Sequence, residues 1–244
     1  RVRVWTTSNP PRHDRHSETE EKEKAASAGT QAATCTAVSD WSSNKTFRIA
    51  RLEDSDWTGT WIAQPGAAVP NPTNSCAFYD DRPNSLFRSV FDLDPTEISD
   101  AVLYITGLGY YEAYLNGEKI GSSTLDPGFT SYERRVLYST YDVLDLLRSS
   151  NNTLAVSLGN GWWNPLPLLF WGHLNLRDHL TVGTQTMLKL DLEVTFVNGT
   201  KSNAVSSQPG NQWKTSGGAL LHNDIYLGVK LDARRQAKLV GWNG

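Results

Sequence analysis

The residue types best suited to ligand recognition gather between positions 159 and 165, which read Gly-Asn-Gly-Trp-Trp-Asn-Pro. Glycine lets the backbone turn sharply, and the amide side chains of Asn160 and Asn164 can bind neighbouring hydroxyl groups of a sugar. Trp162 and Trp163 offer flat rings on which the C–H face of a sugar can stack. The competing interpretation is that these rings cover the end of a β-sandwich.

The geometry of a strand limits which of these tryptophan rings can stack on a sugar. Adjacent side chains of a strand point to opposite faces, so at most one of Trp162 and Trp163 is expected to stack on a sugar while the other packs inward. Trp171 is expected to line the same loop. Since the chain has nine Trp and nine Tyr, most of its rings are expected in the core.

Short β-branched or aromatic runs separated by Gly, Pro, Asn and Asp follow from about Trp41 onward. They lie at residues 86–91, 101–105, 112–115, 135–138, 154–158, 187–197 and 226–240. Regularly spaced strands without helical patterns between them predict an all-β fold, a β-sandwich of the jelly-roll kind. Only residues 141–147 have the apolar spacing of a short helical turn, and Asp142 can accept backbone N–H groups at its start.

Asparagine occurs in two kinds of local signal. Asn116-Gly117 predicts a hairpin, because a type I′ turn needs two residues that tolerate positive φ. Asn44, Asn151 and Asn198 each begin an Asn-X-Thr sequence, which predicts N-glycosylation and therefore a secreted protein. At Asn198 the following glycine supports a hairpin turn as an equally good interpretation.

Residues 12–34 differ in composition from everything after them, being charged and then rich in Ala, Ser, Gly and Thr. Such a stretch cannot bury a core and predicts an exposed, mobile insertion. His13 and His16 have a spacing that occurs in metal sites, but here we expect them to face solvent. Cys35 and Cys76 permit one disulfide without requiring it.

Composition narrows the class of partner. The formal net charge of -3 supplies no electrostatic reason to bind nucleic acid or an anionic membrane. Nor does any run approach the roughly 18 to 20 apolar residues that cross a bilayer. Because the chain opens directly on the strand-like run Arg1–Trp5, we expect its natural N-terminus to lie further upstream.

Several separated motifs occur in one order along the chain. They are Ser55–Ile62, Leu86–Phe91, Gly107–Gly117, Leu125–Thr130, Tyr138–Val143, Leu158–Trp162, His222–Gly228, Asp232–Arg234 and Gly241-Trp242. This order closely resembles the N-terminal β-sandwich domain of bacterial-type α-L-rhamnosidases. The resemblance covers residues 55–244 and implies a galactose-binding-like jelly roll there.

The first part of the chain also resembles a known module. Residues 1–5 and 41–48 look like the last strands of the fibronectin-III-like module that precedes this domain in such enzymes. Residues 6–40 would then form an enlarged hairpin loop. The resemblance thus implies a partial second β-sandwich over residues 1–54, followed by the complete sandwich over residues 55–244.

The resemblance also implies where the chemistry is done. In the family, terminal α-L-rhamnose is hydrolysed by acidic residues of an (α/α)6 barrel that lies C-terminal to this domain, and this sequence stops at Gly244. Inverting hydrolysis needs two carboxyl groups about 6.5–9.5 Å apart. We therefore expect a non-catalytic module whose partners are a rhamnose-containing glycan and the catalytic barrel of the same parent chain.

Some relatives of this domain bind L-rhamnose with the help of a calcium ion, so the resemblance implies calcium as well. Asn160, Asn164 and Asp224 carry the oxygen ligands that a hard cation prefers. Asn223 and Asp224 are also expected to contact the sugar. The alternative role of Asp224 is to cap a turn before Tyr226.

Two departures from the family pattern bear on binding. Phe129 stands where relatives commonly have Trp, and Val229 stands where they often have an acidic residue. Phe129 would keep a ring for stacking but lacks the indole N–H donor, whereas Val229 predicts altered or lost binding at its corner. Two other functions remain open: a stand-alone rhamnose-binding lectin or structural sandwich, and a β-jelly-roll glycosidase active on its own.

Overall fold

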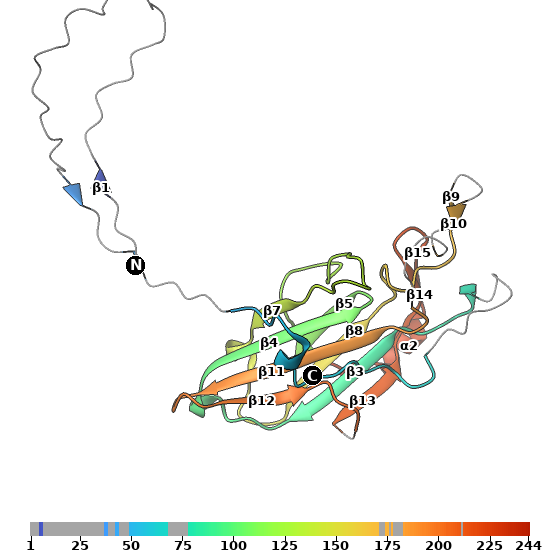
Figure 1. Ribbon diagram of the computed structural model, residues 1–244. Coiled ribbons are helices and arrows are strands. Elements are labelled where there is room, and N and C mark those ends of the chain that lie inside the picture. The colour runs from blue at the N-terminus through green and yellow to red at the C-terminus, as the bar shows by residue number, and fades with distance from the viewer. Residues whose placement is uncertain are drawn as a thin grey trace, which may run out of the picture. The chain divides into compact units, whose positions relative to one another are not determined.

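The computed structural model describes residues 5–6, 37–38, 42–43, 49–67, 78–170, 174–175, 177, 183–210 and 212–244. The chain divides into two units, residues 1–50 and residues 51–244 (Figure 1). In the first unit β1 (Trp5–Thr6) pairs antiparallel with β2 (Ala37–Val38). Its identity as a fibronectin-III-like module stays a prediction, and Cys35 and Cys76 lie outside the described residues.

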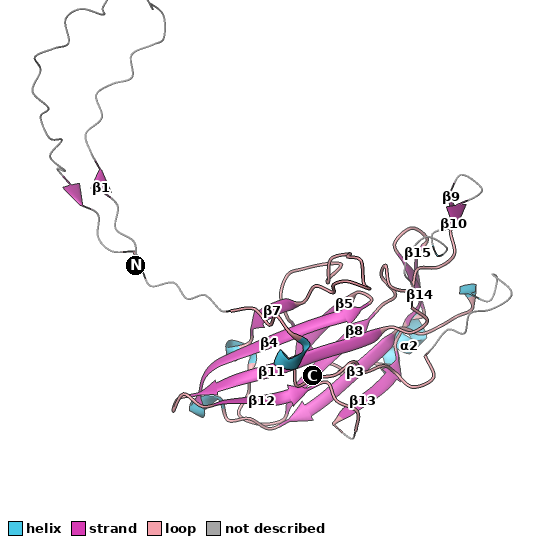
Figure 2. Cartoon of the chain, in the orientation of Figure 1, coloured by secondary structure: helices cyan, strands magenta, loops and turns pink. Residues whose placement is uncertain are grey.

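The second unit is built on two antiparallel sheets, as the strands of Figure 2 show. The first sheet has the order β12 (Lys201–Ser206), β11 (Met187–Phe196), β4 (Ile98–Leu108) and β7 (Ser139–Asp142). The second has the order β13 (Trp213–Gly217), β3 (Ser85–Phe91), β8 (Asn152–Leu158), β5 (Tyr111–Leu115) and β6 (Glu118–Lys119). The predicted all-β sandwich is thereby confirmed.

Shorter elements complete the second unit. Two small antiparallel pairs are β9 (Leu169–Phe170) with β10 (Leu174–Asn175), and β14 (Leu220–Asp224) with β15 (Gly228–Leu231). The helical segments are η1 (Asp54–Asp56), η3 (Pro95–Glu97), η4 (Leu144–Leu146) and α2 (Ala233–Lys238). Within the described part of the chain, no helix is long and apolar enough to cross a membrane.

One hydrophobic core lies between the two main sheets. Along β11 the residues Leu188, Leu190, Leu192 and Val194 are buried in it, while the residues between them point to the other face. From the second sheet, Phe87 and the apolar residues of β8 pack against them. The alternation of apolar and polar residues along β11 therefore decides which face of the first sheet meets the core.

The outer face of the first sheet carries a buried ion pair. Arg51 bonds to the carboxylate of Asp191, which is fully buried, and its guanidinium lies 4.1 Å from the centre of the Tyr104 ring. Asp191 also accepts the backbone N–H groups of Thr58, at 3.0 Å, and Gly59, at 2.8 Å. The segment before β3 is thus held across β4 and β11.

Two local predictions are confirmed. Asn116-Gly117 joins β5 to β6, with positive φ values of 56° and 88°. Residues Leu144–Leu146 form a short helical turn, and Asp142 accepts the N–H of Leu144 at 3.2 Å.

Two other predictions are wrong. Residues 135–138 do not form a strand, because the chain pairs with β4 only from Ser139 onward. Within residues 226–240, expected to be strand-like, only Gly228–Leu231 is a strand and Ala233–Lys238 is a helix. Asp232 caps this helix by accepting the N–H of Arg234, and the sequence that follows consists of good helix formers.

Candidate functional site

The loop that carries most of the predicted binding residues follows β8 and contains a turn over residues 161–164. It passes very close to the loop between β4 and β5. A Cβ atom added at Gly161, where φ is +53°, would lie 2.9 Å from the backbone nitrogen of Tyr110. One added at Gly109 would lie 2.1 Å from the carbonyl oxygen of Gly159. Glycine is therefore required where the two loops meet.

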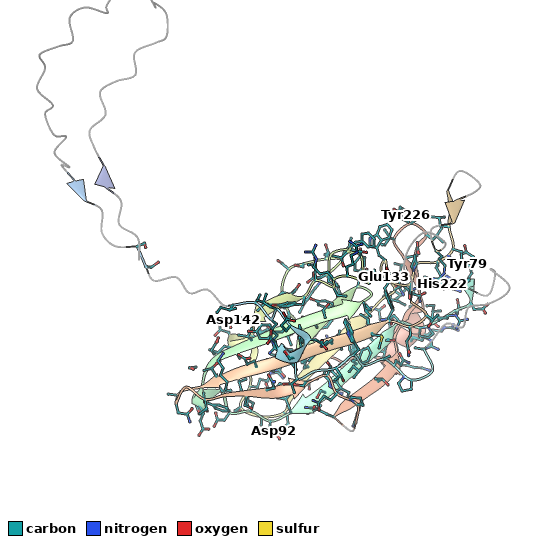
Figure 3. All side chains as sticks on the ribbon, in the orientation of Figure 1. Tyr79, Asp92, Glu133, Asp142, His222 and Tyr226 are labelled. Carbon is teal, nitrogen blue, oxygen red and sulfur yellow. The ribbon has the colours of Figure 1, made fainter. Side chains whose placement is uncertain are left out.

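Five aromatic side chains from three loops meet at this end of the sandwich, and we call them the ring cluster. They are Phe129, Tyr132, Trp162, Trp163 and Tyr226. Ring centres are 5.3 Å apart between Trp162 and Phe129 and 5.6 Å apart between Trp162 and Tyr226. Figure 3 shows Tyr226 at this end and Asp92 toward the other end. The packing is largely edge-to-face, as is favourable for aromatic rings.

The two members that flank Trp162 are open to solvent. Phe129 is 50% exposed and Tyr226 is 51% exposed, whereas Trp162 itself is partly buried. Large exposed rings on a folded protein often mark a binding surface. Trp162 and its two exposed neighbours thus present an apolar surface that a flat ligand could cover.

The two tryptophans of the loop have different neighbours. Trp163 donates its indole N–H to the carbonyl oxygen of Gln185 at 2.7 Å, and its ring packs on Gly183. A Cβ atom at Gly183 would lie only 2.1 Å from this ring. Because the residues lie in a turn and not in a strand, both rings join the same cluster. Trp163 is the anchored ring, which leaves Trp162 as the better candidate for stacking.

The phenols near the cluster stay neutral at physiological pH. Burial, together with a smaller effect of the nearby Tyr110, raises the pKa of Tyr132 to about 12. Burial also raises the pKa of Tyr110, while a hydrogen bond with the side chain of Trp162 opposes that rise. Neutral phenols can both donate to and accept from sugar hydroxyls.

The predicted amide residues mainly hold the loops together. Asn160 donates its backbone N–H to the side-chain oxygen of Asn223 at 2.5 Å and its amide to the Asn223 carbonyl at 3.0 Å. Asn164 is buried, donates to the side-chain oxygen of Asn160 at 3.3 Å, and accepts from Arg177 at 2.9 Å. The cavity beside these amides measures only about 40 Å³, too small for a sugar ring.

Asp224 caps the turn that presents Tyr226. One of its carboxylate oxygens accepts the N–H groups of Tyr226 and Leu227, both at 2.9 Å. The other accepts the N–H of Leu166 at 2.8 Å. This matches the capping role considered from the sequence, and it joins the hairpin β14–β15 to the loop after β8.

The three predicted calcium ligands do not fit a calcium ion. The side-chain oxygens of Asn160, Asn164 and Asp224 all accept hydrogen bonds from the protein, and the donor at Asn164 is a guanidinium cation. A calcium ion takes six to eight oxygen ligands, and the guanidinium of Arg177 at the Asn164 oxygen brings a positive charge to the position where the cation would bind. Among the described residues there is also no group of three or more His, Cys, Asp or Glu that could hold a metal.

Asp126, which sequence reasoning missed, holds the loop that carries Phe129 and Tyr132. One of its carboxylate oxygens accepts three hydroxyl groups, from Tyr111 at 2.9 Å, Ser139 at 2.6 Å and Tyr141 at 2.7 Å. Burial raises the pKa of Tyr111, so it remains a donor. No local pattern pointed to this residue, because its partners come from β5 and β7.

The remaining predicted sites are Trp171 and the three glycosylation sequons, and only some of them lie within the described residues. Trp171 and Asn44 lie outside the described residues. Asn151 and Asn198 are both exposed. In the sequon of Asn151, Thr153 is buried within β8, whereas in the sequon of Asn198, Thr200 is exposed. Glycosylation of Asn44, Asn151 and Asn198 stays a prediction.

Comparison with known proteins identifies the family of the sandwich. A family model described as the alpha-L-rhamnosidase N-terminal domain matches residues 96–244, more than half of the chain. An alpha-L-rhamnosidase of Streptomyces avermitilis is 34% identical over 80% of this chain and 18% of its own length. One of Formosa agariphila is 32% identical over 80% of this chain and 21% of its own. This chain spans about a fifth of the length of these relatives.

Solved structures agree with this result. The native enzyme from Aspergillus terreus superposes with a TM-score of 0.67 and 29% identity, over 82% of this chain and 21% of that one. The Streptomyces avermitilis alpha-L-rhamnosidase complexed with L-rhamnose superposes with a TM-score of 0.53 and 33% identity. That match covers 64% of this chain and 14% of the other.

Proposed function

This chain belongs to the family of α-L-rhamnosidase N-terminal domains, and on that premise we propose that it is a carbohydrate-binding module for glycans containing L-rhamnose. The observation that carries the proposal is the ring cluster, in which Trp162 lies between the exposed rings of Phe129 and Tyr226. The complex of the Streptomyces avermitilis enzyme with L-rhamnose supports the choice of sugar.

The chemistry of the surface suits a 6-deoxy sugar. L-Rhamnose is neutral and carries a methyl group, so its less polar face can cover aromatic rings while its hydroxyls face outward. Tyr226 can supply a hydroxyl group at the edge of the surface. Phe129 keeps the ring that a Trp would supply there but lacks the indole N–H, which removes one donor.

We place hydrolysis in another domain of the parent protein, the C-terminal catalytic barrel. A general acid needs a pKa raised toward neutral pH. Among the described residues, the carboxyl groups with a shifted pKa are Asp56, Asp94, Glu112 and Asp232, and hydrogen bonds lower each of them. This direction is opposite to what a general acid needs.

Titration calorimetry with methyl α-L-rhamnoside tests the binding proposal. Trp162→Ala is expected to weaken binding by about tenfold, because it removes the central stacking ring. Trp242→Ala is the matched control, since that indole contacts Tyr114 outside the ring cluster. Equal affinity of the Trp162→Ala and Trp242→Ala variants would refute the ring cluster as the site.

Two further conditions complete the test. Binding should be unchanged by a calcium chelator, since the amide and carboxylate oxygens near the cluster accept hydrogen bonds from the protein. The purified chain should also fail to hydrolyse an aryl α-L-rhamnoside. Turnover that survives repurification would contradict the assignment of catalysis to another domain.

A further inference from the structure

A groove of about 330 Å³ lies beside β13, at one edge of the five-stranded sheet. Its lining includes Trp61, Phe87, Gln208, Pro209, Trp213 and Thr215. None of its described lining residues belongs to the ring cluster. The loop that carries Phe129 and Tyr132 follows β6, which is the opposite edge of the same sheet. The groove is therefore separate from the site proposed above.

The groove has a rigid apolar base and a few polar groups. Phe87 is fully buried, and Trp213 packs against the core while donating its indole N–H to the carbonyl of Ser206 at 2.9 Å. Gln208 donates to the carbonyl of Thr58 at 3.0 Å, which positions its side chain and leaves its amide oxygen as an acceptor. The volume lies within the range of about 300–1,000 Å³ that is usual for small-molecule sites.

The absence of charged side chains among the described residues that line the groove favours an uncharged ligand. None of the described residues that line the groove is ionisable. An ionised ligand would lose hydration there without gaining a partner of opposite charge. A purely apolar ligand would displace water from the amide oxygen of Gln208 and the hydroxyl of Thr215 without replacing its hydrogen bonds. A neutral ring with one C–H face and several hydroxyls satisfies both requirements.

A peptide strand added to the edge of the sheet is the other occupant to consider. Strand β13 has only five residues, and the side chain of Lys214 is exposed on it. Short edge strands with an exposed lysine resist pairing with another strand. We propose that the groove is a second carbohydrate site, which binds a neutral hexopyranose ring against Trp61 and Trp213.

The indole N–H signals in ¹H–¹⁵N spectra test this site directly, because each tryptophan gives its own signal. Single Trp→Phe substitutions at positions 61, 162, 213 and 242 assign the four signals needed. L-Rhamnose and D-galactose are the neutral probes, and D-galacturonate is the charged counterpart of D-galactose. We expect at least one neutral sugar to shift the Trp61 signal saturably, D-galacturonate to leave it in place, and the Trp242 signal to stay unmoved.

Variants separate this proposal from the previous one. In Trp162→Ala the affinity read at Trp61 should change by less than about twofold, because independent sites do not couple. Trp61→Ala, read at the Trp213 indole, should weaken binding by at least about fivefold, and Trp61→Phe should largely restore it.

Three results would overturn the second site. One is a Trp61 signal that no neutral sugar moves, even when the Trp162 signal responds. Another is an equal response to D-galacturonate. The third is a Trp61 response that disappears in Trp162→Ala, since the groove would then only report binding at the ring cluster.

Discussion

Glycine at position 161 decides whether the loop after β8 can approach the loop before β5. Its φ of +53° is unfavourable for a side chain, and the space around it is already filled by Tyr110. Gly199 has a φ of +85° but nothing within 4 Å of a Cβ atom. Both positions therefore have a positive φ that favours glycine, but only at Gly161 would a side chain also clash with neighbouring atoms.

Gly161→Ala is expected to lower the free energy of unfolding by more than Gly199→Ala, which should cost only about 1–2 kcal/mol of backbone strain. The additional loss at Gly161 comes from the contact with Tyr110. Urea unfolding of both variants measures the difference. Equal losses would mean that the two loops can separate without cost.

The aromatic residues of the ring cluster also differ in how well their roles can be predicted from the sequence. Trp162 and Trp163 were recognised as a pair, but the turn geometry and the hydrogen bond of Trp163 to Gln185 distinguish their roles. Tyr132 was not singled out, because nothing in its neighbourhood is periodic. A ring in a loop has no local pattern that says which other loop it will meet.

At the scale of elements, Asp126 connects the loop between β6 and β7 to the sheets. Asp126→Asn replaces a carboxylate that accepts three hydroxyl groups by a neutral amide with a weaker acceptor. We expect a loss of about 1–3 kcal/mol in unfolding free energy. Rhamnoside affinity should also fall, because Phe129 and Tyr132 are carried by this loop.

Asp142→Asn is the control for this change. Asp142 accepts a single exposed backbone N–H, from Leu144, and asparagine caps equally well. Urea unfolding and rhamnoside titration of both variants make the comparison. If Asp126→Asn behaved like Asp142→Asn in both measurements, Asp126 would have no positioning role.

The hairpin of β5 and β6 contains a pH-dependent ion pair. The hydrogen bond from Lys119 holds the pKa of Glu112 below its ordinary value, against the effect of burial. Because the folded pKa is lower than the unfolded value of about 4.3, the pair stabilises the fold above that pH. This stabilisation is lost as the pH falls through the folded pKa.

Lys119→Met is expected to reduce the unfolding free energy at neutral pH by only about 0.2–1 kcal/mol, since both side chains are substantially exposed. The difference from the unaltered protein should disappear below the folded pKa of Glu112 and shrink in about 1 M salt. Urea unfolding over a pH series measures it. A difference that persists in acid would show that Lys119 acts through packing.

At the scale of the whole molecule, Asp191 joins the start of the second unit to the centre of its first sheet. It is buried and accepts Arg51 together with the N–H groups of Thr58 and Gly59. Asp191→Asn leaves Arg51 without its main counter-charge. Breaking one partner of a buried pair costs about 3–5 kcal/mol, and we expect a loss of that size.

Hydrogen exchange locates the effect of this change. At least one of the amides of Thr58 and Gly59 should exchange faster in Asp191→Asn, since asparagine keeps only one of the two oxygens that accept them. Glu193→Gln is the control, because Glu193 is partly exposed and its bond to Arg51 is longer, at 3.4 Å. Unchanged protection at Thr58 and Gly59 would mean that the segment before β3 is held by other contacts.

The sequence alone was sufficient for the class of fold, the family resemblance and the local turns. The strand-like run at 187–197, the turn at Asn116-Gly117 and the ordered motifs can be recognised in the sequence, and the structure and the family comparison confirm them. Two strand predictions failed, each for a different reason. At Asp232 a helix cap ended the strand pattern, and at residues 135–138 an apolar run had no neighbouring strand to pair with.

Only the tertiary structure decided which residues meet. Trp162 contacts Phe129 and Tyr226 because three loops, far apart in the chain, end at the same side of the sandwich. The same folding brings protein hydrogen-bond donors to the side-chain oxygens of Asn160, Asn164 and Asp224, which the sequence alone marks only as possible ligands of calcium. Residue type shows what a side chain can bind, whereas its partners depend on long-range packing that no local pattern encodes.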